Sequence, residues 1–281
     1  MKIAIIYNSL EWCEQQMRRI LHNKGHSVTF QYANTPDPDS FDLVFNRVMP
    51  SIAAKDHNFH QALYKEYLEE LEKSNAIVIN SLNASIADID KLFSTDCMRK
   101  QETPTPKMYK ANFRDIDIIT QKLGFPIIRK PSMSGRSGGV IKCNNMNELT
   151  KALLIDDIVN GYVVLQEYIE SVVPHDYRVL VCNGKILFAI SRSLVDGWLG
   201  SISKGSKAFH LTSIPTDLEK LAIEASKSIG AVINGIDIVV GKDGPVVIEN
   251  NPTPNFRKSY IDMLGFNPVE KIIDLVLEGI K

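Results

Sequence analysis

The first 90 residues alternate short apolar runs with amphipathic stretches. Lys2–Tyr7 is almost continuously apolar, as expected for a strand buried on both faces. Residues 11–24 carry apolar side chains at helical spacing and are followed by Gly25, a common helix stop. Further ranges follow as strand, strand, helix, strand and helix, at Ser27–Tyr32, 42–48, 59–73, 76–80 and 85–93. Strands that alternate with helices predict a parallel sheet with helices on its faces.

The pattern changes later in the chain, where strands are joined by short turns. Pro104 and Pro106 indicate a boundary after the first unit, and the change to hairpins comes further on, from Tyr177. Asn183-Gly184 is the strongest short signal for a hairpin, and a second hairpin is predicted to turn at residues 242–244. The chain is therefore predicted to be α/β, becoming α+β in its C-terminal half, with at least two lobes.

Charge and composition exclude several classes of partner. The 281 residues contain 32 Lys and Arg against 33 Asp and Glu. A near-neutral chain has no overall field that draws it to nucleic acid or to an anionic membrane surface. No apolar run approaches membrane-spanning length, and the N-terminal run lacks a small-residue cleavage site. We therefore expect a cytoplasmic protein with no nucleic-acid or membrane partner, in which any phosphate binding depends on local groups.

The second hairpin carries acidic residues at facing positions. A turn centred on Asp243 would pair Asp237 with Glu249, at a cross-strand distance of about 5 Å. Two carboxylates so close would repel each other unless a cation lay between them. Asn251 is two residues beyond Glu249, so its amide oxygen points to the same face. Three hard oxygen ligands suit Mg²⁺; the alternative is a solvated acidic patch on an edge hairpin.

A loop rich in glycine and serine follows a strand that ends in Lys130-Pro131. Residues 134–139 of this loop offer backbone N–H groups without side-chain obstruction, which suits phosphate binding. The loop lacks the lysine signature of a P-loop and returns into a strand. A flexible hairpin connection is the alternative. Lys130 favours the phosphate site, because a lysine at the end of an apolar strand has a reason to be there if it meets phosphate.

These features occur in a fixed order along the chain. The order is Lys91, Lys130 with its glycine loop, Gln166-Glu167-Tyr168-Ile169, Asp176-Tyr177-Arg178, and the set Asp237, Glu249 and Asn251. In this order the sequence resembles the ATP-grasp superfamily and, within it, the RimK-type ligases, including those of lysine biosynthesis. The resemblance implies an ATP-grasp fold with two lobes clasping ATP. A Rossmann-like pre-ATP domain would span residues 1–90, a small lobe 91–165, and a large lobe with the metal site 166–281.

The resemblance also implies roles for individual residues. ATP phosphates would contact Lys91 and Lys130, beneath a cover that includes Ser134, Gly135, Ser137 and Gly138. The adenine would lie against Gln166, Glu167, Tyr168 and Ile169, with Glu167 at the adenine amino group. Asp176 would bind the ribose hydroxyls, and Arg192 would face a phosphate. Mg²⁺ or Mn²⁺ would be held by Asp237, Glu249 and Asn251.

The chain departs from the RimK pattern in one mobile loop, and one strand face raises a question. The pattern has Arg-Ser-Asn and then Arg-Gly-Gly, whereas here Ser201 replaces the Asn and Lys204 would stand in for the Arg. In an ideal first hairpin, Arg192 would point to the face opposite Asp176 and Arg178. Either a bulge intervenes or only one arginine meets the nucleotide.

The implied reaction is the joining of a carboxylate to an amine. Transfer of the γ-phosphoryl group of ATP would give an acylphosphate, which an amine attacks with release of phosphate. The partners would be an amino-acid donor and an amine or carboxylate acceptor, which is a small molecule, a peptide or a protein terminus. A homo-oligomer is compatible with the sequence. We expect catalytic roles for Arg192, Lys204 and Arg257. Arg257 would hold a substrate carboxylate, and the alternative is an ordinary surface residue. Arg47 is the second candidate for binding that carboxylate.

The segment after the metal ligands resembles the lysine-biosynthesis ligases more than the glutamate ligases that modify ribosomal protein. The same ATP chemistry would also suit a D-alanine–D-alanine-type ligase or a peptide-modifying macrocyclase. A nucleotide-binding regulatory module without turnover is the alternative from another class. ATP hydrolysis that depends on an added amino acid separates the enzymes from that module.

Overall fold

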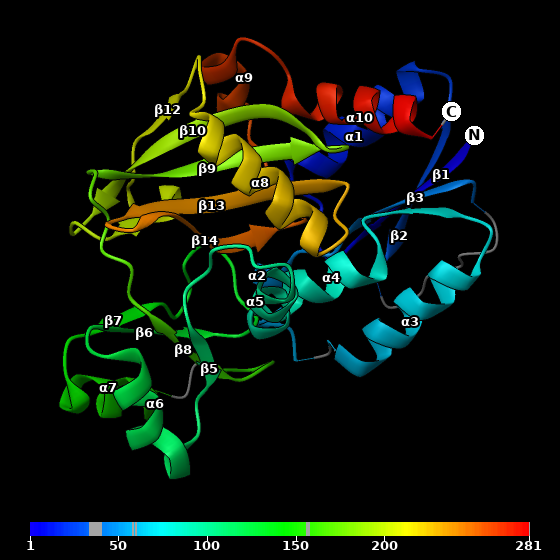
Figure 1. Cartoon of the computed structure of the whole chain (residues 1–281). Coiled ribbons are helices and arrows are strands. Elements are labelled where there is room, and N and C mark those ends of the chain that lie inside the picture. The colour runs from blue at the N-terminus through cyan, green and yellow to red at the C-terminus, as the bar shows by residue number, and fades with distance from the viewer. Residues whose placement is uncertain (34–40, 58, 60, 156–157, 281) are drawn as a thin grey trace.

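The computed structural model describes residues 1–33, 41–57, 59, 61–155 and 158–280. Their strands form three sheets (Figure 1). We call the parts that carry them the N-terminal domain (strands within residues 2–79), the small lobe (strands within 108–167) and the large lobe (strands within 175–251). The predicted mixed α/β architecture is therefore confirmed. Over these described ranges, no helix has both the length and the apolar character needed to cross a membrane.

The N-terminal sheet is parallel and has the order β2-β1-β3-β4. Its strands are β1 Lys2–Tyr7, β2 Ser27–Tyr32, β3 Leu43–Arg47 and β4 Ile77–Ile79. Ile3 and Ile5 of β1 pack in the core that contains α1 (Trp12–Asn23), whereas Ala4 and Ile6 pack in the core that contains α3 (Gln61–Lys73). Burial of both faces explains why this strand is apolar at nearly every position.

The helix expected at residues 85–93 is in fact two helices, α4 (Leu82–Ile89) and α5 (Lys91–Lys100). Asp90 separates them, and its carboxylate accepts hydrogen bonds from Leu92 N at 3.0 Å and Phe93 N at 3.1 Å. An aspartate cap starts a new helix without interrupting the apolar periodicity, so the pattern alone did not reveal the break. As a result, Lys91 is the first residue of α5.

The small-lobe sheet is antiparallel, with the order β5-β8-β6-β7. Its strands are β5 Met108–Lys110, β6 Ile127–Pro131, β7 Ile141–Cys143 and β8 Val163–Glu167, so the expected boundary at residue 165 falls inside β8. Helices α6 (Ile116–Leu123) and α7 (Met146–Leu153) pack in one core with Ile127 and Leu165. Ile128 and Lys130 alternate with that face, so their side chains point to the opposite face.

The large-lobe sheet has the order β11-β10-β9-β13-β14, with β12 beside β10. Its strands are β9 His175–Cys182, β10 Lys185–Val195, β11 Leu199–Gly200, β12 Ala208–His210, β13 Ile233–Gly241 and β14 Gly244–Asn251. Helix α8 (Thr216–Ser228) packs in the core that contains Ile236 and Ile238. On the outer edge, Val247 N donates to Pro104 O at 2.9 Å, so the chain after α5 covers β14.

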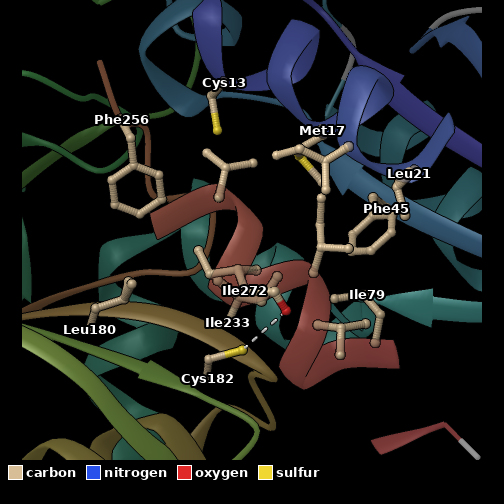
Figure 2. Packing of buried hydrophobic residues seen from close by; sticks show 14 of the residues in the cluster. Cys13, Met17, Leu21, Phe45, Ile79, Leu180, Cys182, Ile233, Phe256 and Ile272 are labelled. Atoms are coloured by element: carbon tan, nitrogen blue, oxygen red, sulfur yellow. Dashed lines mark hydrogen bonds between the residues drawn. The ribbon is translucent and has the colours of Figure 1, made fainter. Parts of the chain in front are cut away.

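One continuous core joins the N-terminal domain to the large lobe. Figure 2 shows Cys13 and Met17 of α1 close to Ile272 of α10 (Pro268–Gly279), with Cys182 of β9 beyond it. Phe256 reaches the same core from the segment between β14 and α9 (Ser259–Leu264) and is 4% exposed. The N-terminal domain is therefore packed firmly against the lobe that carries the acidic hairpin.

Candidate active site

A cleft of about 120 Å³ lies between the small and large lobes. One wall carries Lys130 of β6 and Gln166 of β8, and the other carries Asp176 of β9, Arg192 of β10 and Asp237 of β13. The residues singled out in the sequence that line it are Lys91, Lys130, Ser134, Gly135, Ser137, Gln166, Tyr168, Ile169, Asp176, Arg192, Asp237 and Glu249. Residues distant in sequence thus converge on one cleft, as their order along the chain suggested.

In the hairpin of β13 and β14, Asp237 pairs with Glu249 as predicted, but for a different reason. The turn holds two residues between the paired Gly241 and Gly244, so it does not centre on Asp243. That register alone would place Ile248 opposite Asp237. A bulge at Ile248 shifts the pairing by one residue and brings Glu249 to face Asp237.

The hairpin of β9 and β10 also contains a bulge, and this decides the face of Arg192. The register shifts at Leu187, after which Arg192 pairs directly with Asp176. The ideal-hairpin expectation of opposite faces is therefore wrong, because the bulge adds one residue to β10. Arg192 Nε and Nη2 donate to the two carboxylate oxygens of Asp176 at 2.8 and 2.7 Å.

Asp237 lies in the same buried charge cluster. Arg178 Nε and Nη2 donate to Asp237 Oδ1 and Oδ2, both at 2.7 Å, and Arg192 Nη2 is 3.3 Å from Asp237 Oδ1. Burial would raise the pKa of Asp237, but the Arg178 and Arg192 guanidinium groups hold it below its usual range. At Asp176 burial prevails and raises the pKa despite Arg192. The repulsion expected between the hairpin carboxylates is thus relieved by guanidinium groups.

Lys91 connects the acidic hairpin to the glycine loop. Its Nζ is 3.2 Å from Glu249 Oε1 and 3.0 Å from Ser134 Oγ. The Glu249 side chain remains 28% exposed, whereas that of Lys91 is 7% exposed. Glu249 is therefore the carboxylate of the cleft that is most open to an incoming cation or ligand.

Lys130 and Gln166 lie on the cleft face of the small-lobe sheet. Burial lowers the pKa of Lys130 to about 8, although Glu249 acts in the opposite direction. The Gln166 side-chain oxygen is buried and has no hydrogen-bond partner within the described part of the chain. A buried amide oxygen and a buried ammonium group are groups that a polar ligand would satisfy.

Glu167 differs from its neighbour Gln166. Its Oε2 accepts a hydrogen bond from Lys107 N at 3.0 Å, and its side chain does not line the cleft. Alternation along β8 places the two side chains on opposite faces. The structure therefore does not support the expected contact between the Glu167 carboxylate and adenine.

Four other residues named from the sequence lie outside the lining of the cleft. Lys204 and Arg257 are exposed, and Gly138 belongs to the glycine loop without lining the cleft. Asn251 pairs with Gly235, and its Nδ2 donates to Gly235 O at 2.9 Å. This bond turns the amide oxygen of Asn251 away from the backbone, on the strand face that carries Asp237 and Glu249.

Arg47, the second candidate for a substrate carboxylate, is occupied within the protein. It is 4% exposed, its Nε donates to Glu14 Oε1 at 2.9 Å, and its Nη1 donates to Pro254 O at 3.0 Å. Glu14 is itself fully buried. This buried ion pair leaves Arg47 no free face for a substrate, so that interpretation is wrong.

Sequence reasoning missed two charged groups near the site. Arg178 was left without a role, yet it holds Asp237; the register of β9 with β13, which pairs the two residues, was not readable from the sequence. Asp88 lies near Lys91 and Glu249, and burial raises its pKa to about 7. In the sequence Asp88 resembles any polar residue of a helix surface, so no signal distinguished it.

The candidate metal ligands are two carboxylates and one amide. Within the described ranges, no three His, Cys, Asp or Glu side chains group as a metal site. The set of Asp237, Glu249 and Asn251 has the hard oxygen chemistry that Mg²⁺ prefers.

Comparison with known sequences gives a consistent result. A model of the RimK-like ATP-grasp domain matches residues 88–276. The alpha-aminoadipate–LysW ligase LysX of Saccharolobus solfataricus is 26% identical over 273 residues, which are 93% of this chain and 97% of that protein. A probable alpha-L-glutamate ligase of Shewanella halifaxensis is 27% identical over 228 residues, 78% of this chain and 46% of that protein. The chain thus spans about half the length of the Shewanella ligases it matches.

Solved structures with the same fold are ATP-grasp proteins. D-cycloserine synthetase DcsG superposes with a TM-score of 0.74 at 17% identity and covers all of both chains. A RimK domain protein from Sphaerobacter thermophilus gives 0.72 at 16% identity, over 98% of this chain and 99% of that one. The ligase PsnB, in complex with a minimal precursor, Mg and ADP, gives 0.67 at 18% identity over 98% and 97%. At such identities the likeness shows a shared fold.

Proposed function

The chain belongs to the RimK-like ATP-grasp family, and from this premise we propose that it is an ATP-dependent ligase that joins a carboxylate to an amine. The reaction would consume ATP and release ADP and phosphate. The observation that carries this proposal is the cleft, where cationic side chains from the small-lobe side meet the acidic hairpin of the large lobe.

The nucleotide would occupy this cleft. Lys91 and Lys130 would bind its phosphates, and backbone N–H groups of residues 134–139, the phosphate loop, would cover them. Gln166 offers its unpartnered oxygen to the adenine amino group, while Tyr168 and Ile169 line the same end of the cleft. Both oxygens of Asp176 already accept hydrogen bonds from Arg192. Asp176 would bind the ribose hydroxyls through the lone pairs that this ion pair leaves free.

Mg²⁺ or Mn²⁺ would be held by Glu249, Asn251 and Asp237. Glu249 fits this role because it is partly exposed, and Asn251 fits because its amide nitrogen is already engaged, which leaves its oxygen for a cation. Asp237 would join them by exchanging part of its bidentate pair with Arg178 for the cation. Bound there, the metal would neutralise charge on the β- and γ-phosphates. Lys91, now 3.2 Å from Glu249, would be released toward the phosphates as the cation takes over that carboxylate.

The chemistry requires positioning more than covalent work by the protein. A carboxylate oxygen of the substrate attacks the γ-phosphorus, the bond to the β-phosphate oxygen breaks, and ADP leaves. The amine then attacks the acyl carbon, loses a proton, and phosphate leaves. Lys130 and Arg192 stabilise the charge of the transferring group, since both are buried in the cleft wall.

We propose an amino acid as donor and an amine or a carboxylate-bearing molecule as acceptor, in keeping with the names of the related ligases. Exposed Arg257 follows the acidic hairpin closely and would hold a substrate carboxylate. Burial would raise the pKa of Glu11, but its contacts with Arg136 and Asn255 hold that pKa below its usual range, and the Arg257 guanidinium adds to this effect. The role of Lys204 and a cytoplasmic location remain predictions.

A screen of amino acids and their conjugates for ADP release tests the proposal. ADP release that requires Mg²⁺, an acid and an amine together is the expected result. ATP binding without substrate-dependent release across the screen would favour the regulatory module instead.

A further inference from the structure

The segment that follows the acidic hairpin, residues 252–257, is held by the N-terminal domain. It begins directly after Asn251 and ends at Arg257, so its position sets the position of both. Three side chains of that domain hydrogen-bond along it: Asn80 with Pro252 O at 2.8 Å, Arg47 with Pro254 O at 3.0 Å, and Glu11 with Asn255 Nδ2 at 2.6 Å. Successive contacts over so few residues fix the path of this segment.

Two of these contacts, those of Asn80 and Arg47, are buried. Asn80 is 4% exposed, and its side-chain oxygen also accepts from Val232 N and Ile233 N at 2.8 and 2.9 Å. Arg47 is neutralised by the fully buried Glu14. Phe256 adds an apolar anchor in the core of α1 and α10 (Figure 2). The first part of the segment is thus part of the folded framework.

Glu11 differs because it contacts two loops at once. Its side chain is 26% exposed; Oε2 accepts from Asn255, while Oε1 forms an ion pair with Arg136 of the phosphate loop. Arg136 is also held through its carbonyl, which accepts from Ser203 Oγ at 2.9 Å. One carboxylate therefore joins the phosphate loop to residues 252–257.

The phosphate loop has further contacts with the N-terminal domain. Met133, just before it, is 1% exposed in the core of that domain. Gly135 lies against Ser51 of α2 (Pro50–Ala53), where a Cβ on Gly135 would come within 2.7 Å of Ser51 Cβ. The loop therefore rests on the same domain that holds residues 252–257, and Glu11 is the residue common to both.

We propose that Glu11 is a positioning residue that couples nucleotide binding at the phosphate loop to the order of residues 252–257. The inference rests on the proposed function, since it takes ATP to be the ligand that settles the loop. When phosphates hold the loop down, Arg136 stays beside Glu11, and Glu11 in turn keeps Asn255 in place. Arg257, two residues beyond Asn255, is then held more firmly toward the substrate when ATP is bound.

Hydrogen exchange with Mg²⁺ and a non-hydrolysable ATP analogue tests this coupling. In the wild-type protein the analogue should slow amide exchange in residues 134–139 and in residues 252–258. In Glu11→Ala and in Arg136→Ala, residues 252–258 should lose about fivefold of that protection, the scale of a modest ion pair. The double variant should lose no more than either single variant, because both remove the same link.

Lys24→Ala is the matched control. Lys24 is the C-cap of α1, at the opposite end of this helix from Glu11, and forms an ion pair with Asp274 at 2.7 Å. Lys24→Ala should leave the protection of residues 252–258 unchanged. Protection of residues 252–258 that survives in Glu11→Ala, or that is lost equally in Lys24→Ala, overturns the coupling while ATP binding stands. Absence of any protection by the analogue in the wild type would instead contradict the proposed function.

Discussion

The two hairpins of the large lobe are built alike but end with different electrostatics. Each has a two-residue turn and one bulge, at Leu187 in the first and at Ile248 in the second. In the first, Asp176 is closed in a bidentate pair with Arg192, and the two side chains are only 8% and 4% exposed. In the second, Asp237 is likewise closed in a bidentate pair with Arg178, but Glu249 is 28% exposed, and a single lysine contacts one of its oxygens.

This difference separates a structural carboxylate from an available one. A buried carboxylate in a bidentate pair has spent most of its hydrogen-bonding capacity, and separating it from its arginine is costly. A partly exposed carboxylate with one lysine can exchange that lysine for a metal ion. We therefore assign the cation-binding role to Glu249 of the second hairpin, and to Asp176 of the first hairpin the role of holding Arg192 in place at the cleft wall.

The largest effect should come from the available carboxylate. Glu249→Gln removes the charge that attracts a cation but keeps the shape of the side chain. Loss of a residue that only supports a metal ligand typically costs about 10- to 100-fold in activity. Loss of a direct ligand should cost more, so Mg²⁺-dependent ATP turnover should fall by at least about 100-fold. ADP release measured at several Mg²⁺ concentrations checks this. Glu219→Gln on the exposed face of α8 is the control. Unchanged turnover in Glu249→Gln would remove the metal role from the second hairpin.

The closed pair should respond in stability. Arg192→Ala leaves Asp176 buried without its partner, which we expect to lower the free energy of unfolding at pH 7 by about 3–5 kcal/mol. Burial already raises the pKa of Asp176 in the wild type. Without Arg192 this pKa should rise further, so Asp176 in the variant becomes protonated, and loses its unpaired charge, as the pH falls. The deficit should therefore shrink as the pH falls from 7 toward 5.

Urea unfolding at both pH values measures this effect. Lys65→Ala, which breaks an exposed pair with Glu69, should change stability little at either pH. A deficit for Arg192→Ala that is no larger than for this control would show that the first hairpin does not depend on its ion pair.

How much of this could be predicted from the sequence differs between backbone and side chains. The apolar run Lys2–Tyr7 identified β1, because a strand buried on both faces leaves a continuous signal. The order of the motifs along the chain and the spacing of the second hairpin predicted that Asp237 and Glu249 face each other. That success was partly fortunate, since a shorter turn and a bulge cancelled each other.

Side-chain contacts across sheets were beyond sequence reasoning. No local pattern reports that Arg178 on β9 lies opposite Asp237 on β13, because the pairing depends on the order of strands in the sheet. The burial of Arg47 beside Glu14 depends in the same way on how α1 packs against β3. The face predicted for Arg192 was also wrong, because the bulge at Leu187 adds a residue to β10.

Alanine substitutions at two glycines test how closely the chain packs around each of the two hairpins. A Cβ on Gly200 of β11 would overlap the Asp176 carboxylate, whereas one on Gly235 of β13 would meet its nearest atom, Pro254 Cβ, at 3.6 Å. Gly200→Ala should therefore cost about 1–3 kcal/mol in unfolding free energy, and Gly235→Ala less than about 0.5 kcal/mol. Thermal unfolding of both variants decides; equal losses would contradict the close packing over Asp176.

The smallest expected effect concerns pH. Burial lowers the pKa of Lys130 to about 8, so this side chain loses its charge as the pH rises above 8. Phosphate favours the protonated form, so binding of the ATP analogue should take up a proton near pH 8.5, and affinity should fall about fivefold from pH 8 to 9. Calorimetry in two buffers of different ionisation enthalpy measures the uptake. Binding without proton uptake would show that Lys130 does not meet the phosphates.

The most direct test of the ATP site is calorimetric titration of wild-type protein and Lys130→Ala with the non-hydrolysable ATP analogue in the presence of Mg²⁺. We predict one site per chain in the wild type. Binding to Lys130→Ala should be at least tenfold weaker, a loss of about 1.4 kcal/mol in binding free energy. Thermal unfolding should show that both proteins are folded. Equal affinity in the two proteins, or no binding to the wild type, would contradict the account of the cleft as an ATP site.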